Sequence, residues 1–153
     1  MNKAIAIKKI IVKPGKGRDY PIIIGANILP QLGNYLQESN FGKKVVIITN
    51  PKIKKLYSTP IIQSLKKQNI NVHIITVPDG ESSKNLKEVS KIIDKLLDLR
   101  LERKDTLIAL GGGVIGDLCG FVASIYLRGI NLIQVPTTLL AQSDSCIGSK
   151  SSI

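Results

Sequence analysis

The sequence predicts an α/β protein with a parallel sheet, helices on both faces and an N-terminal hairpin. Short runs of apolar, β-branched residues alternate with amphipathic segments along the 153 residues, at the spacing typical of βαβ units. The turns after these runs are rich in Gly, Thr, Asp and Lys. Open parallel sheets bind ligands at these strand ends. We therefore expect one Rossmann-like domain over residues 1–153.

The N-terminal part of the chain predicts the hairpin and a first helix. Residues 4–12 and 20–24 have strand-like patterns and flank a turn with proline and glycine at 14–17. Asn27 is a residue type that favours helix N-caps, so we expect a helix from there to about Glu38.

The rest of the chain predicts the alternating strands and helices of the sheet. The apolar run Val45 to Thr49 is typical of a strand buried on both faces. Proline favours the first turn of a helix, so Pro60 predicts a helix over 60–68. An apolar stripe that includes Leu86, Leu96 and Leu97 predicts an amphipathic helix over 83–97. The remaining expected elements are strands at 72–77, 106–110 and 132–135, a helix at 114–127 and a short helix opened by residues 136–138.

Composition excludes several classes of protein. With 43% hydrophobic residues the chain can bury a core, and no apolar run approaches the roughly 20 residues of a membrane span. Two cysteines and one histidine are too few for a disulfide framework or a histidine-rich metal site. The N-terminus lacks the pattern of a secretory signal, so we expect a cytoplasmic protein with no membrane partner.

The net charge of +11 lies entirely in the first part of the chain. Residues 1–70 hold 13 basic and 2 acidic residues, whereas residues 71–153 hold 9 of each. A basic half fits an anionic partner such as nucleic acid, a membrane surface or a phosphorylated metabolite. The lysines are scattered, aromatic residues make up 4%, and no nucleic-acid motif is present. We therefore favour a solvated basic face and expect no nucleic-acid partner.

A glycine-rich turn carries the clearest chemical signal. Gly111, Gly113 and Gly116 satisfy G-x-G-x-x-G after an expected strand and at the start of an expected helix. The backbone N–H groups of such a turn suit a diphosphate, although a tight strand-to-helix connection needs the same glycines. The usual ribose-binding acid about 20 residues later is missing. The ribose must then be held from elsewhere, either by Thr49 and Asn50 or by residues 78–84, where Asp79 and Ser83 could equally be helix caps.

Two further polar groups follow the last expected strand. Thr137 and Thr138 suit either an anion or a helix N-cap. Asp144 and Lys150 lie just beyond, among small residues, and such a loop could enclose a polar metabolite.

Together these motifs resemble the 3-dehydroquinate synthase family of sugar-phosphate cyclases. The matching segments are 78–84, 111–118, 120–123, 126–129 and 133–145. The resemblance covers the whole chain and implies the N-terminal, NAD-binding part of a protein about twice as long, truncated before the family's α-helical metal-binding domain. It implies conversion of a seven-carbon phosphorylated keto acid (DAHP) to 3-dehydroquinate and phosphate in the shikimate pathway. The implied steps are transient oxidation by NAD+, phosphate elimination and intramolecular aldol closure.

The resemblance also implies roles for individual residues. The residues expected to bind the cofactor are Asn50, Asp79, Gly80, Glu81, Ser82, Ser83, Lys84, Gly112, Gly113, Val114, Ile115, Gly116, Asp117, Thr137 and Thr138. Asp144 and Lys150 would meet the substrate and the nicotinamide end, and Arg128 would bind the substrate phosphate across a homodimer interface. The family's divalent metal, zinc or cobalt, would be held by a glutamate and two histidines beyond residue 153, so we expect this chain alone to be inactive.

One departure and three alternatives stay open. Ser149 stands where the family has a glycine, which strains the backbone by about 1–2 kcal/mol or moves Lys150 if the position has a positive φ. The alternatives are another sugar-phosphate cyclase, a metal-dependent alcohol dehydrogenase of the glycerol dehydrogenase type, and a basic anion-binding module.

Overall fold

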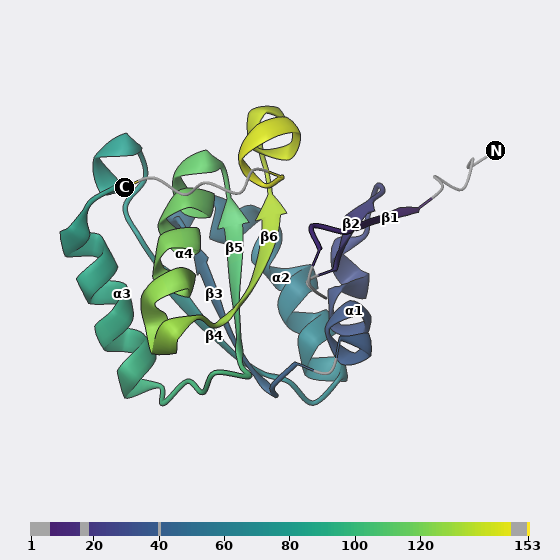
Figure 1. Ribbon diagram of the computed structural model, residues 1–153, viewed down its shortest axis with the longest axis horizontal. Helices are drawn as coiled ribbons and strands as arrows, with labels where there is room; N and C mark the ends of the chain where they lie inside the picture. Colours follow the sequence, from purple (N-terminus) through teal and green to yellow (C-terminus); the bar gives the residue numbers. More distant parts are fainter. Residues whose placement is uncertain (1–6, 16–18, 40, 148–152) are drawn as a thin grey trace.

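The computed structural model describes residues 7–15, 19–39, 41–147 and 153, and its centre is a four-stranded parallel sheet (Figure 1). The strands lie in the order β4-β3-β5-β6. Their bounds are β3 Lys44–Thr49, β4 Asn71–Thr76, β5 Thr106–Gly111 and β6 Asn131–Pro136. All three strand pairings are parallel, which confirms the expected sheet.

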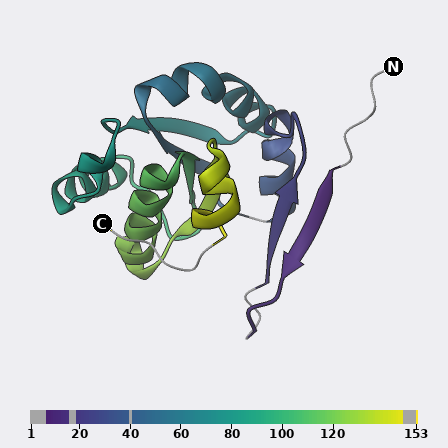
Figure 2. The same ribbon diagram turned by 90° about the horizontal axis from the view of Figure 1, so that it is seen from above.

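Helices cover both faces of this sheet, as expected (Figure 2). The helices α1 (Leu32–Glu38) and α2 (Pro51–Lys67) pack on one face, and α3 (Leu86–Asp98) and α4 (Gly113–Ile125) on the other. Successive side chains of β3 enter opposite cores: Val45 and Ile47 pack toward α1 and α2, Val46 and Ile48 toward α3 and α4. All four are fully buried, so the continuous apolar run follows from burial on both faces.

The N-terminal hairpin is also confirmed, and it forms a sheet of its own. β1 (Lys8–Val12) pairs antiparallel with β2 (Tyr20–Ile24), and the pair lies beside the main body (Figure 2). The expected N-cap at Asn27 is wrong. Asn27 has a φ of 56° and belongs to a turn, and the short 3-10 turn η1 (Leu29–Gln31) precedes α1.

The second helix begins nine residues earlier than expected. The side chain of Asn50 accepts a hydrogen bond from the Ile53 N–H at 2.8 Å, and Pro51 occupies the first turn. Asn-Pro therefore supplies the start signal, and Pro60 lies inside the helix rather than at its beginning. This shift brings the N-terminus of α2 directly to the end of β3.

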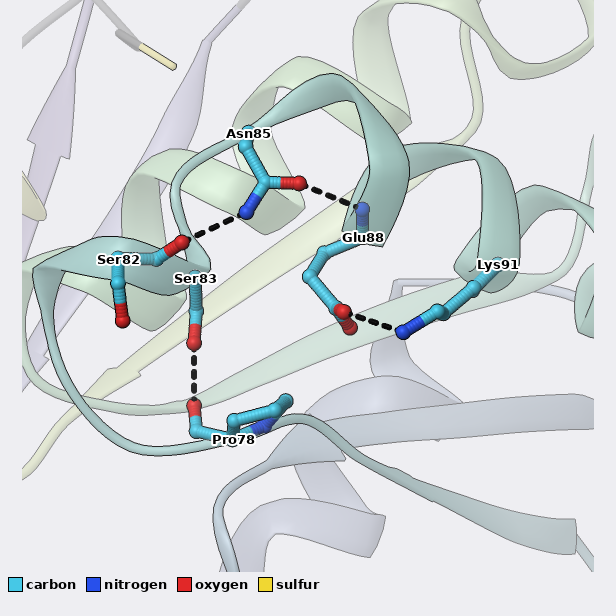
Figure 3. A network of polar contacts seen from close by, with 6 residues as sticks. All are labelled: Pro78, Ser82, Ser83, Asn85, Glu88 and Lys91. Atoms are coloured by element: carbon cyan, nitrogen blue, oxygen red, sulfur yellow. Dashed lines mark hydrogen bonds and ion pairs between the residues drawn. The ribbon is translucent and has the colours of Figure 1, made fainter.

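The third helix begins at Leu86, three residues later than expected. Asn85 caps it by accepting a hydrogen bond from the Glu88 N–H, and residues 81–83 form the 3-10 turn η2 (Glu81–Ser83). A local network holds the turn: Ser83 donates to the Pro78 carbonyl at 2.8 Å and Asn85 to the Ser82 carbonyl at 2.6 Å (Figure 3). Leu86 and Leu97 are exposed, so the expected apolar stripe is wrong for these two residues.

The last expected helices differ at their ends. α4 ends at Ile125 and is followed by the short 3-10 turn η3 (Tyr126–Arg128). Leu127 and Arg128 both have positive φ, so the α-helix does not extend through them. After β6 the chain forms one turn of π-helix, η4 (Ala141–Ser145). Within the described ranges, no helix combines the length and the apolar character needed to span a membrane.

The neighbouring leucines of α3 give a matched test of this packing. Leu96 is fully buried, whereas Leu97 is 56% exposed. We expect Leu96→Ala to lower the free energy of unfolding by about 2–5 kcal/mol because it leaves a cavity. Leu97→Ala should change it by less than about 0.5 kcal/mol. Urea unfolding measures both, and equal losses would contradict the assignment of the buried face.

Candidate functional site

A pocket lies at the edge of the sheet where the strands end. Its volume is about 250 Å³, and it collects residues that follow all four parallel strands. The lining residues are Asn50, Lys52, Ile53, Pro78, Asp79, Gly80, Gly112, Gly113, Val114, Ile115, Thr137 and Thr138. Of the fifteen residues expected to bind a cofactor, the structure brings together nine in this pocket.

The glycine turn leaves open space at the N-terminus of α4. Gly112 is the N-cap, and among the described residues a Cβ added to Gly113 would meet only the Ser145 Oγ, at 3.7 Å. A Cβ on Gly111 would instead come within 2.6 Å of Ile115, so packing requires that glycine. The first N–H groups of a helix lack intrahelical acceptors and carry partial positive charge. This combination of open space and free donors is suited to a phosphate group.

The two threonines after β6 have different roles. Thr138 Oγ1 accepts a hydrogen bond from the Ala141 N–H at 3.2 Å and so acts as a helix cap. The Thr137 N–H donates to the Gly111 carbonyl, which extends the pairing of β6 with β5. The Thr137 hydroxyl is buried and has no hydrogen-bond partner among the described residues. A ligand oxygen in the pocket would satisfy it.

Asn50 links the loops that follow β3 and β4. While its Oδ1 caps α2, its Nδ2 donates to Asp79 Oδ1 at 2.9 Å. The same Asp79 oxygen accepts the Gly80 N–H at 3.1 Å. Asp79 therefore caps no helix in the described structure, and its second oxygen, Oδ2, carries no hydrogen bond there. Gly80 has a φ of 99°, a conformation that favours glycine.

Lys84 ties the same loop to α4. Its ammonium lies 2.9 Å from Asp117 and 3.0 Å from Glu81. Lys84 and Asp117 are mostly buried, with 16% and 17% of their side chains exposed, whereas Glu81 is 75% exposed. Hydrogen bonds to Asp117 and then to Glu81 raise the pKa of Lys84 above its usual 10.5. Lys84 is thus a fixed cation beside the pocket at neutral pH.

The remaining expected site residues do not line the pocket. Glu81, Ser82 and Ser83 form η2 beside it and Lys84 directly follows, whereas Gly116 and Asp117 lie deeper in α4. Asp144 is exposed on η4, next to α4, and Arg128 lies at the opposite end of α4. Lys150 and Ser149 fall outside the described residues.

Two pocket residues, Lys52 and Ile53, are absent from the sequence prediction. They belong to the first turn of a helix that the sequence places at Pro60, and the Asn50-Pro51 pair is the signal that could have found them.

The described residues offer no metal site. Nowhere in the described ranges do three His, Cys, Asp or Glu side chains cluster as ligands. His73 lies on β4, beside a separate surface hollow of about 330 Å³ that it shares with Lys95 and Asp98.

A family model and several curated relatives match the chain to one family. A family model described as 3-dehydroquinate synthase N-terminal matches residues 74–153. The chain is 48% identical over 133 residues to 3-dehydroquinate synthase of Desulforamulus reducens, covering 87% of this chain and 37% of the relative. It is 47% identical over 138 residues to the chloroplastic 3-dehydroquinate synthase of Solanum lycopersicum, covering 89% of this chain and 31% of the relative. The chain thus spans about a third of the length of these curated relatives.

A solved structure shares the fold. It is 2-deoxy-scyllo-inosose synthase complexed with carbaglucose-6-phosphate, NAD+ and Co2+. The TM-score is 0.79 at 28% identity, over 92% of this chain and 38% of that chain.

The pair Lys84 and Asp117 provides a test of the site's electrostatics. We expect Asp117→Asn to lower the pKa of Lys84 more than Glu81→Gln does, because Asp117 is the less exposed partner. Folding raises this pKa, so the pairs stabilise the fold below pH 10.5, and the stabilisation is lost as the pH rises through the raised value. NMR titration of the lysine side chains measures the pKa. An equal or larger effect of Glu81→Gln would contradict this ranking.

Proposed function

The chain belongs to the 3-dehydroquinate synthase family, and from this membership we propose that it binds NAD+ for the conversion of DAHP to 3-dehydroquinate and phosphate. The observation that carries the proposal is the pocket at the ends of the four parallel strands, with the open helix N-terminus at its centre. Because the chain spans only about a third of its relatives, the activity of the whole protein is part of the proposal.

The residues of the pocket fit a dinucleotide. The N–H groups of Gly113, Val114 and Ile115 would hold the diphosphate at the start of α4. The Thr137 hydroxyl, which has no hydrogen-bond partner in the described part of the chain, would bind the dinucleotide on the β6 side, toward η4 and Asp144. Asn50 and Asp79, on the β3 and β4 side, would then bind the adenosine ribose. The neighbouring β3 and β5 ends are about 4.8 Å apart, a step comparable to a sugar ring.

When bound, NAD+ would accept a hydride from the substrate and return it within the same turnover. The chain's own residues would position the dinucleotide for this step. The Lys84–Asp117 ion pair fixes η2 against α4, so the two loops that contact the cofactor are held together. The described residues do not fit the family's divalent metal.

The position of Arg128 supports a homodimer. α4 starts at the pocket and is 13 residues long. Arg128, in η3 beyond the far end of α4, therefore lies about 20 Å from the glycine turn. A side chain cannot span that distance back to its own pocket. The family resemblance implies that Arg128 binds the substrate phosphate of a second copy, and its distance from its own pocket agrees with that role. We therefore include a homodimer in the proposal.

The alternatives have less support. Identity to curated 3-dehydroquinate synthases is 46–48%, against 28% to the 2-deoxy-scyllo-inosose synthase structure. Net NADH production from glycerol would favour a dehydrogenase, and steeply salt-dependent binding to DNA without binding of NAD+ would favour a basic anion-binding module. A cytoplasmic location stays a prediction.

The proposal predicts that the 153-residue chain binds NAD+. Gly113→Val should weaken binding at least tenfold, because its side chain enters the open space before α4. The φ of Gly113 is not positive, so the variant should stay folded by far-UV circular dichroism. Ser124→Ala, near the far end of α4, is the control and should bind like the wild type. Isothermal titration calorimetry measures the affinities, and no heat from the wild type with NAD+ would refute the proposal.

A second prediction concerns turnover. We expect no phosphate release from DAHP by the 153-residue chain with NAD+ and Zn2+, because its described residues hold no cluster of metal ligands. A coupled phosphate assay tests this, and release above the rate without protein would show that the chain suffices for the reaction.

A further inference from the structure

Two opposite charges line one side of the pocket. Asp79 follows β4, and Lys52 belongs to the first turn of α2, which follows β3. In the described part of the chain, Lys52 forms no ion pair, with Asp79 or any other carboxylate. Asp79 accepts both of its hydrogen bonds on Oδ1, which leaves Oδ2 available. One anionic acceptor and one unengaged cation therefore face the same small space.

This side of the pocket is where the proposed function puts the adenosine ribose. The carboxylate that accepts a hydrogen bond from the ribose 2′-hydroxyl is the usual means of selecting NAD, and a nearby cation is the usual means of accepting the 2′-phosphate of NADP. This pocket contains both. Asp79 and Lys52 are both exposed, so their charges act through water. At close contact a carboxylate still repels a 2′-phosphate, and an ammonium group still attracts it.

We infer that Asp79 makes this pocket select a dinucleotide with a free 2′-hydroxyl, and that Lys52 binds a 2′-phosphate once the Asp79 charge is removed. The inference rests on the proposed dinucleotide site and adds its specificity. Asp79 would contribute the repulsion that excludes NADP+, and Lys52 a positive charge that NAD+ does not use.

The structure offers a substitution that removes only the charge. In Asp79→Asn the side-chain oxygen can still accept from Asn50 Nδ2 and from the Gly80 N–H, so the link between the two loops is retained. If Asp79 served only that link, the variant would bind both dinucleotides like the wild type. If Asp79 also selects the dinucleotide, the variant should prefer NAD+ over NADP+ less strongly than the wild type does.

Calorimetry of the 153-residue chain with NAD+ and with NADP+ tests this. The wild type should bind NADP+ at least tenfold more weakly than NAD+. Asp79→Asn should raise the affinity for NADP+ at least tenfold. The added substitution Lys52→Met should abolish that gain, whereas Lys55→Met, which removes a charge outside the pocket on the same helix, should leave it intact. The gain should also shrink as salt is added.

The outcomes separate this inference from the proposed function. Binding of NAD+ by the wild type without a gain for NADP+ in Asp79→Asn refutes the inference alone, as does a gain that survives Lys52→Met. Equal affinity of the wild type for the two dinucleotides also refutes it. No heat with either dinucleotide refutes the proposed function and this inference together. Should Asp79→Asn lose the circular dichroism of the folded chain, Asp79→Ser provides the same readout.

Discussion

Burial of the central strands on both faces is the constraint on which the rest of the structure depends. β3 and β5 are buried along their whole length or nearly so, between helices on either side. The helical crossovers that connect parallel strands lie on the faces of the sheet, and here they cover both faces. Parallel strands bring all their following loops to one edge. The pocket is therefore a consequence of the parallel arrangement, which the apolar cores on both faces stabilise.

Polar contacts then hold these loops in register. Asn50 joins the β3 loop to the β4 loop through Asp79, and Lys84 joins the β4 loop to α4 through Asp117. Both contacts involve a carboxylate, and each connects segments that are far apart in the sequence. Burying the sheet brings the loops near one another, and these contacts fix their relative positions.

The far end of α4 shows where the chain accepts strain. Leu127 and Arg128 have φ values of 50° and 61°, which cost about 1–2 kcal/mol each for residues with a side chain. The buried Tyr126 hydroxyl donates toward the Leu96 and Leu101 carbonyls, at 3.3 and 3.1 Å, and anchors the turn. The turn leaves Arg128 exposed at the edge opposite the pocket, in keeping with a role toward a second copy.

The sequence by itself determined the elements that depend on local patterns. Apolar runs predicted the strands of the sheet, and the glycines after Leu110 predicted the open helix N-terminus, because both signals are read within a few residues. Helix starts were predicted less well. Asn27 and Ser83 have residue types that favour caps, and Pro60 one that favours a first turn, but no helix begins at any of them. Only the tertiary structure decided that Asn50 also holds Asp79 and that Lys52 lines the same pocket as Asp79. These features depend on which strands are neighbours in the sheet, and strand order is set by packing between distant segments, which no local pattern records.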